Sequence, residues 1–259
     1  MSEVNHNCLN CHAELAGKYC IECGQKASTH RITFKHFFEH DLLHGFMHIE
    51  KGLVYTILQV FRKGGKAALE YLAGKRVRYY NVFYLSLLLL GLDIVLVSYK
   101  HQKFPETAAV ATGELQGFYE VLASHVKYVI LAFIPLMALN SFVFFLKKKH
   151  NYLEHMWVAG FCMVGCLTLS VLNNASLLLF SNINTAAENV DFIFNLLTYL
   201  FPIYFYYAYV RPQISVGGYT WRIITFMVIF LIEILVLMLL VYYLLNGNLN
   251  ISGEFYFVV

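Results

Sequence analysis

Five long apolar stretches constrain this chain more than any other feature of its sequence. Each is close to the ~20 residues that a helix needs to cross a bilayer, and backbone groups in lipid must be satisfied internally, which favours helices. Charged residues make up only 14% of the 259 residues, against about 25% in ordinary soluble domains. The sequence therefore predicts an all-α polytopic membrane protein with five transmembrane helices, within residues 81–99, 126–146, 155–180, 190–210 and 221–245.

The basic residues predict how these helices are oriented. Lys and Arg gather before the first stretch, in "KKKH" at 147–150 and at Arg211 and Arg222, while the tail after residue 246 has none. Since cytoplasmic loops carry an excess of Lys and Arg, we expect a multi-pass inner (cytoplasmic) membrane protein with a cytoplasmic N-terminus and an external, periplasmic C-terminus. The first residues lack an apolar core followed by a cleavage site, so no signal peptide is expected.

Four of the six cysteines form two Cys-x-x-Cys pairs separated by eight residues. Two residues between cysteines allow a tight turn to present both thiolates to one ion, and two such knuckles complete a tetrahedral zinc site. A redox pair would occur singly at a helix start. A shell of four thiolates leaves no position for a catalytic water, so the sequence predicts a structural zinc ribbon within residues 1–30, with ligands Cys8, Cys11, Cys20 and Cys23.

Residues 31–80 form an amphipathic, basic segment between the ribbon and the transmembrane domain, residues 81–259. Eleven of the nineteen Lys and Arg precede residue 81 and the net charge is only +3, which favours a membrane-facing segment and not nucleic-acid binding. Within it, "GGKAALEYLAGKRVRYY" predicts a short helix along the headgroups that ends at Gly74. Lys75, Arg76 and Arg78 would then contact lipid phosphates, or serve only as positive-inside anchors.

Four histidines recur at four-residue steps in "HFFEHDLLHGFMH". In a helix His36, His40, His44 and His48 would share one broad face, opposite an apolar face. We expect a solvated or headgroup-facing stripe. A second metal site at one neighbouring pair and a pH sensor are the alternatives.

Residues 48–83, together with the ribbon, resemble a family of Bacteroidota membrane proteins of unknown function. Its members have an N-terminal zinc ribbon, a basic segment and several transmembrane helices. The resemblance implies a fold and a membrane location but no activity. The matching residues are Gly52, Thr56, Gly65, Tyr71, Gly74, Lys75, Arg76, Tyr79 or Tyr80, and Phe83.

Two acids, Asp93 and Glu233, lie deep within the predicted helices. Acids inside a membrane are costly and point to function. Each lies twelve residues from the start of its stretch, about 18 Å along a helix. The two could form a pair that shares a proton, or two separate neutral acids bonded locally.

These features favour a non-enzymatic membrane anchor or adaptor whose cytoplasmic ribbon docks a protein partner. The sequence contains no Ser/His/Asp set and no His-Glu-x-x-His motif, so no enzyme is expected. A small transporter or channel using Asp93 and Glu233 is the first alternative, and a lipid-acting membrane enzyme the second. We expect contact with membrane lipids; a homo-oligomer is compatible with the sequence, which names no substrate or partner.

Overall fold

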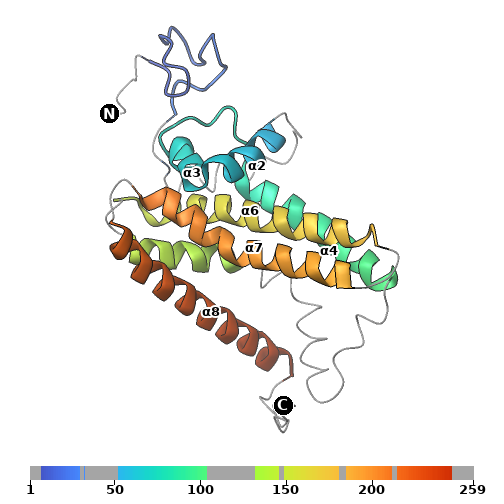
Figure 1. The fold of residues 1–259 in the computed structure, drawn as a ribbon. Helices are drawn as coiled ribbons and strands as arrows, with labels where there is room; N and C mark the ends of the chain where they lie inside the picture. The colour runs from blue at the N-terminus through green and yellow to red at the C-terminus, as the bar shows by residue number, and fades with distance from the viewer. Residues whose placement is uncertain are drawn as a thin grey trace.

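A computed structural model describes residues 7–29, 32, 52–103, 132–145, 149–180, 185–211 and 215–246. Its regular structure over these ranges is helical, with two isolated β-bridges in the cysteine module (Figure 1). The predicted histidine stripe, His36 to His48, lies outside the described residues. The helices are α2 (Gly52–Lys63), α3 (Gly65–Leu72), α4 (Val82–Lys103), Ala132–Phe144, α6 (Tyr152–Leu177), α7 (Thr185–Val210) and α8 (Val216–Asn246).

Four of these helices are long and apolar enough to cross a membrane, over Val82–Lys100, Tyr152–Leu177, Thr185–Val210 and Val216–Val241. The predicted all-α membrane architecture with an N-terminal four-cysteine cluster is confirmed. The predicted span 126–146 is described only in part, as the shorter apolar helix Ala132–Phe144. A fifth span therefore stays a prediction.

Helix α6 is the centre of the bundle. It packs against α4 and α7 along its length, and α2 and α3 lie across it near its N-terminal end (Figure 1). Its first turn is closed by a capping box in which Asn151 and Glu154 satisfy each other's backbone N–H groups. Tyr71 of α3 stacks on Trp157, with ring centroids 4.4 Å apart. The segment that precedes the predicted transmembrane domain is thus packed directly against the central helix.

The helix ends define two poles of the molecule. At one pole the Lys103 ammonium donates to the carbonyls of Leu178 (2.6 Å) and Phe180 (2.8 Å), which places the end of α4 beside the end of α6. These two helices therefore run parallel, and the chain must return to the opposite pole between them. The helix Ala132–Phe144 lies on that return.

The sequence predicts a short helix that lies along the headgroups. In the structure, α2 and α3 are instead part of the packed core. Val60, Ala67 and Ala68 are fully buried. At Gly65 an added Cβ would lie 2.5 Å from the Phe205 carbonyl oxygen, so only glycine allows this approach to α7. Small side chains allow close helix packing, which explains why the segment sinks into the bundle. The helix end predicted near Gly74 is confirmed, since α3 ends at Leu72 and Gly74 has φ +102°.

Candidate metal centre

The cysteine module is built from two knuckles related by a shift of twelve residues. The Cys8 N–H donates to the Ala13 carbonyl at 2.8 Å, and the Cys20 N–H donates to the Gln25 carbonyl at the same distance. A β-bridge flanks each knuckle, Asn7 with Glu14 and Tyr19 with Lys26. Sequence reasoning missed this internal repeat because only the cysteines are common to both knuckles.

Each knuckle closes on a residue with positive φ. Gly24 takes this conformation in the second knuckle, with φ +74°. His12 is the equivalent residue of the first knuckle, with φ +64°. The N–H of each donates back to the first cysteine carbonyl of its knuckle, at 2.8 Å for His12 and 2.9 Å for Gly24. The same turn therefore aims both cysteine pairs inward.

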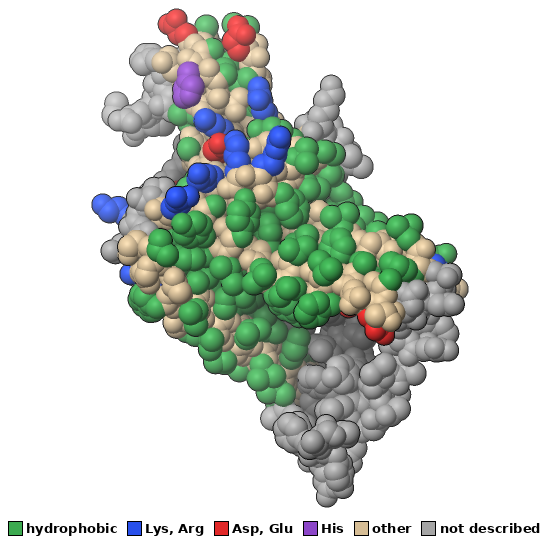
Figure 2. All heavy atoms as spheres, in the orientation of Figure 1, with side chains coloured by type: hydrophobic (Ala, Val, Ile, Leu, Met, Phe, Trp, Pro, Cys, Tyr) green, Lys and Arg blue, Asp and Glu red, His purple; other side chains and the backbone are tan. Residues whose placement is uncertain are grey.

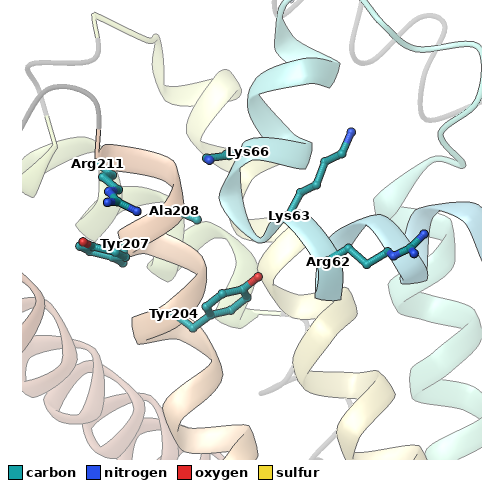
Figure 3. Close-up of a pocket in the computed structure, with 7 residues that line it drawn as sticks. All are labelled: Arg62, Lys63, Lys66, Tyr204, Tyr207, Ala208 and Arg211. Atoms are coloured by element: carbon teal, nitrogen blue, oxygen red, sulfur yellow. The ribbon is translucent and has the colours of Figure 1, made fainter.

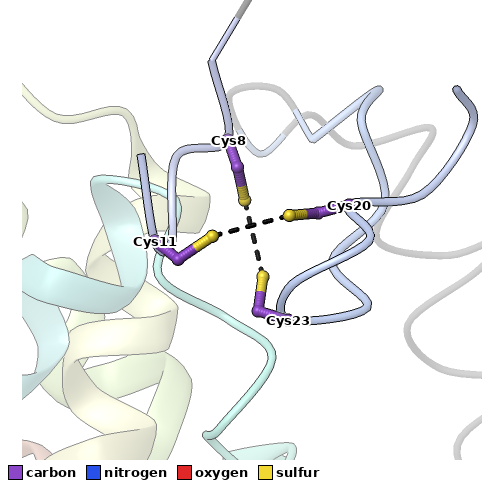
Figure 4. Close-up of side chains that lie close together, drawn as sticks. All are labelled: Cys8, Cys11, Cys20 and Cys23. Atoms are coloured by element: carbon purple, nitrogen blue, oxygen red, sulfur yellow. Dashed lines mark hydrogen bonds between the residues drawn. The ribbon is translucent and has the colours of Figure 1, made fainter. Parts of the chain in front are cut away.

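The four cysteine side chains point their sulfur atoms toward a common centre (Figure 4). All four Sγ atoms lie within 4.8 Å of one another, and the cysteines are not joined in disulfides. The distance is 3.5 Å between Cys8 and Cys23 and also between Cys11 and Cys20. Zinc–sulfur bonds of about 2.3 Å in a tetrahedron would separate the sulfurs by about 3.8 Å. The set fits one tetrahedral ion, and both knuckles are needed to hold it.

The protonation of these thiols shows why a cation is required. The backbone N–H of Ala13 lowers the pKa of Cys11, but burial and the neighbouring thiols raise it to about 12. Burial raises the pKa of Cys23, but the Gln25 N–H and the Asn10 side chain outweigh it and bring the pKa to about 7. One sulfur can ionise near neutral pH while a neighbour keeps its proton. Four thiolates at this spacing need a positive ion between them.

The module is seated on the turn after α3 through side chains of both knuckles, Leu9 of the first and Gln25 of the second. The buried Gln25 side chain donates from Nε2 to the Gly74 carbonyl at 2.7 Å and accepts from the Arg76 N–H at 3.2 Å. Leu9, at the tip of the first knuckle, rests on Gly74, where an added Cβ would lie 2.6 Å from the leucine Cδ1. Glycine is required here both for its positive φ and for this contact.

The tip of the second knuckle faces away from the bundle. Ile21 occupies the position in this knuckle that Leu9 occupies in the first, yet it is 84% exposed. Tyr19 beside it is 61% exposed. The module extends beyond α2 and α3 at the N-terminal side of the molecule (Figure 1). The tip of the first knuckle therefore contacts the bundle, and the tip of the second presents apolar side chains to the outside.

The three predicted headgroup-contact residues lie in the turn that receives the module. Arg76 stacks its guanidinium 5.4 Å from the centre of the Tyr71 ring and donates from Nε to the Tyr71 carbonyl at 3.4 Å. Lys75 is half-buried and Arg78 is exposed. Figure 2 shows Lys and Arg side chains between the module and the apolar body on this face. Lipid contact by these residues stays a prediction.

The two intramembrane acids bond to different helices. Asp93 of α4 accepts from Ser170 Oγ and Asn174 Nδ2 of α6, both at 2.9 Å. Glu233 of α8 accepts from Asn140 Nδ2 at 2.7 Å. These bonds favour the alternative of two separate acids, each satisfied locally, and pairing of the acids stays a prediction.

Sequence reasoning missed a buried histidine at the pole of the molecule where α6 begins. His155 is fully buried, and its Nδ1 lies 2.7 Å from the Ser141 hydroxyl. Its ring contacts the rings of His150 and Tyr209, which hydrogen-bond to each other at 2.7 Å. Only the apolar residues around it signalled burial.

Comparison of the chain with protein-family models, curated proteins and solved structures found no match.

Proposed function

We propose that the protein is a membrane anchor that presents a zinc-loaded four-cysteine module to a protein partner. The observation that carries this proposal is the unequal exposure of the two knuckle tips. Leu9 is half-buried and lies against Gly74, whereas Ile21 and Tyr19 are exposed. Large exposed apolar side chains on a rigid turn are typical of an interaction surface.

The chemistry of the exposed knuckle describes the partner. Ile21 is followed by Glu22, which is also exposed, and Figure 2 shows acidic side chains at the outer end of the module. A partner with an apolar pocket and basic residues at its rim would complement this surface. The helices that hold the module to the membrane keep it at a defined distance from the bilayer.

A photo-crosslinking amino acid at Tyr19, used in native membranes, tests the docking proposal. We expect an adduct of one defined mass that disappears when Ile21 is changed to Ser. Ala16→Ser, an exposed substitution in the same module, is the matched control and should keep the adduct. An adduct that is unchanged in Ile21→Ser, or no adduct with a folded module, would contradict the proposal.

Zinc is the metal we propose for the site. Tetrahedral sets of four thiolates take zinc or iron, and zinc fits a closed structural site. Elemental analysis of the purified protein should find one zinc per chain and no iron. Stoichiometric iron, with the colour of an iron–thiolate centre, would refute this assignment.

Membrane orientation follows from the same proposal. A cytoplasmic module requires the basic pole, where α6 and α8 begin, to face the cytoplasm, as the positive-inside rule predicts. Reporter fusions after residue 30 and within 147–150 should report a cytoplasmic location. A fusion after residue 246 should report an external one if the segment around Ala132–Phe144 crosses the membrane.

A small transporter is the second candidate, because one observation favours it. Asp93 shares a polar cluster with Ser170 and Asn174, and the adjacent Asn173 donates to Asp191 at 2.9 Å. Polar groups of this kind line proton and cation routes in membranes. Proton flux into liposomes that is lost in Asp93→Asn would support this function, and equal flux in the variant would exclude this route.

A further inference from the structure

A basic pocket opens between the α2–α3 turn and the end of α7. Its volume is about 270 Å³, and it is lined by Arg62, Lys63, Lys66, Tyr204, Tyr207, Ala208 and Arg211. Four of the seven lining residues are cationic and none is acidic. None of these residues belongs to the metal centre or to the seat of the module.

The four cations differ in how their charge is used. Lys63 bonds to both carboxylate oxygens of Glu70, at 2.8 and 2.9 Å. Figure 3 shows the side chains of Lys63 and Arg62 extending away from Lys66. Lys66 extends from the start of α3 toward the side on which Arg211 and Ala208 lie (Figure 3). Arg211 lies over the Tyr207 ring, 5.6 Å from its centre. Lys66 and Arg211 are therefore the cations best placed for a ligand.

The pocket lies where the apolar surface of the bundle ends. Arg211 directly follows Val210, the last residue of α7. Tyr204 is 44% exposed and donates to the Phe61 carbonyl at 2.9 Å, while Leu200, one turn earlier, is also exposed. Tyrosines of this kind mark the level of the headgroups. A ligand held here would have an anionic group at the cations and room for apolar chains along α7.

We infer that this pocket binds a phosphate group, and that an anionic phospholipid headgroup supplies it. Basic pockets between membrane helices bind such headgroups. The volume is below the ~300–1,000 Å³ of pockets for drug-sized ligands, which suits a headgroup with its acyl chains outside. The residues differ from Lys75, Arg76 and Arg78, which lie in the turn under the cysteine module.

Lipid retention by the purified full-length chain tests the inference. The protein is exchanged into nanodiscs of phosphatidylcholine with a minor fraction of phosphatidylglycerol, and the lipids that stay bound after gentle extraction are counted by native mass spectrometry. We expect preferential retention of phosphatidylglycerol, weakened about fivefold for each of Lys66→Gln and Arg211→Gln, since each cation contributes roughly 1 kcal/mol near a charged headgroup.

Controls and competition decide the source of the phosphate. Lys18→Gln with Lys26→Gln, two exposed cations of the cysteine module, removes equal charge outside the pocket and should leave retention unchanged. The exchanged variants Lys66→Arg and Arg211→Lys keep the charge and should retain the lipid. Excess inorganic phosphate should not displace the lipid; displacement, with phosphate itself bound, would support the phosphate site but assign it to a soluble ligand. Equal retention in wild type and the Lys66→Gln, Arg211→Gln double variant would overturn the inference.

Discussion

The two cysteine knuckles have the same backbone turn, but their tips have opposite surroundings. Each has the same hydrogen bonds and the same positive-φ closure. Leu9 of the first knuckle is seated on Gly74, while Ile21 of the second is 84% exposed. The difference shows that the metal site and the attachment to the bundle depend on different side chains of the module. Four sulfurs from both knuckles surround the candidate metal site, while Leu9 of the first knuckle and Gln25 of the second make the attachment.

Breaking the metal site should remove both knuckles together, and this is the largest effect we expect. Cys20→Ser removes a ligand from the second knuckle, yet its sulfur lies 3.5 Å from that of Cys11 in the first. Metal binding supplies much of the folding free energy of small zinc modules, so zinc content should fall from one per chain toward zero and residues 7–29 should unfold.

Elemental analysis and proteolysis of the module would measure this loss, and the helices should remain folded. His40→Gln with His44→Gln is the matched control and should leave the zinc content unchanged. A Cys20→Ser protein with full zinc would refute the shared site, and loss of metal in the histidine variant would identify a second one.

Gly74→Ala should loosen the seat of the module on the turn after α3 without emptying the metal site. The new Cβ would lie 2.6 Å from Leu9, at a φ of +102° that side chains rarely adopt. The strain should cost about 1–3 kcal/mol. Hydrogen exchange of the Arg76 amide, which donates to Gln25, should speed up accordingly. Gly17→Ala has no atom within 4 Å of the new Cβ and should change nothing; equal exchange in both variants would show that the seat is not needed.

Changing the two knuckle tips to serine should separate attachment from presentation. Leu9→Ser removes an apolar contact on the seat and should destabilise it by about 1 kcal/mol. Ile21→Ser should change the stability by less than about 0.5 kcal/mol, as is usual at exposed positions. Thermal unfolding of the module, followed by release of zinc to a chelator, would measure both. Equal destabilisation by the two substitutions would mean that the tip of the second knuckle also packs on the bundle.

The smallest effect that we expect is a pH dependence of the seat, caused by Glu70 of α3. Burial raises the pKa of Glu70, but its bonds to Lys63 and Tyr79 outweigh burial and hold the pKa below the ordinary value of 4.5. A carboxyl with a lowered folded pKa contributes stability above its unfolded pKa, and this is lost as pH falls through the folded value. Because Glu70 is 30% exposed, the contribution should be below about 1 kcal/mol.

Exchange of the Arg76 amide between pH 6 and 3 would test this pH dependence. The wild-type seat should weaken below about pH 4.5, from the ordinary carboxyl value. Glu70→Gln should be weaker at pH 6 and lack this part of the pH dependence. An identical pH profile in the two proteins would exclude Glu70 as the cause.

The sequence predicted the helices and the metal ligands because both are local signals. Apolar length identified five candidate spans, of which four are helices long and apolar enough to cross a membrane, and the spacing of the cysteines identified all four sulfurs that meet. It did not predict that α3 is buried, since burial depends on Gly65 and two alanines meeting α7, far along the chain. The seat of Gln25 on Gly74 joins residues 49 positions apart, and no local pattern marks it.

The polar pairs within the bundle show the same limit. Asp93 and Glu233 were singled out because charge in an apolar stretch is visible in one dimension. Their partners, Asn174 and Asn140 among them, depend on which helices are neighbours. Equal depth suggested a pair, but depth does not specify the side of a helix on which a residue lies.

The uneven burial of α6 and α8 has a consequence for how the chain enters the membrane during synthesis. Within the most apolar part of each helix, 72% of α6 is buried inside the structure, but only 17% of α8. Helix α8 is exposed over most of this stretch among the described residues. Apart from Glu233, which bonds to Asn140 of an earlier helix, it needs few neighbours to be stable in lipid. Helix α6 carries Asn173, Asn174 and His155, which are costly in lipid alone. We expect the translocon to release α8 singly, and to hold α6 until α7 emerges beside it.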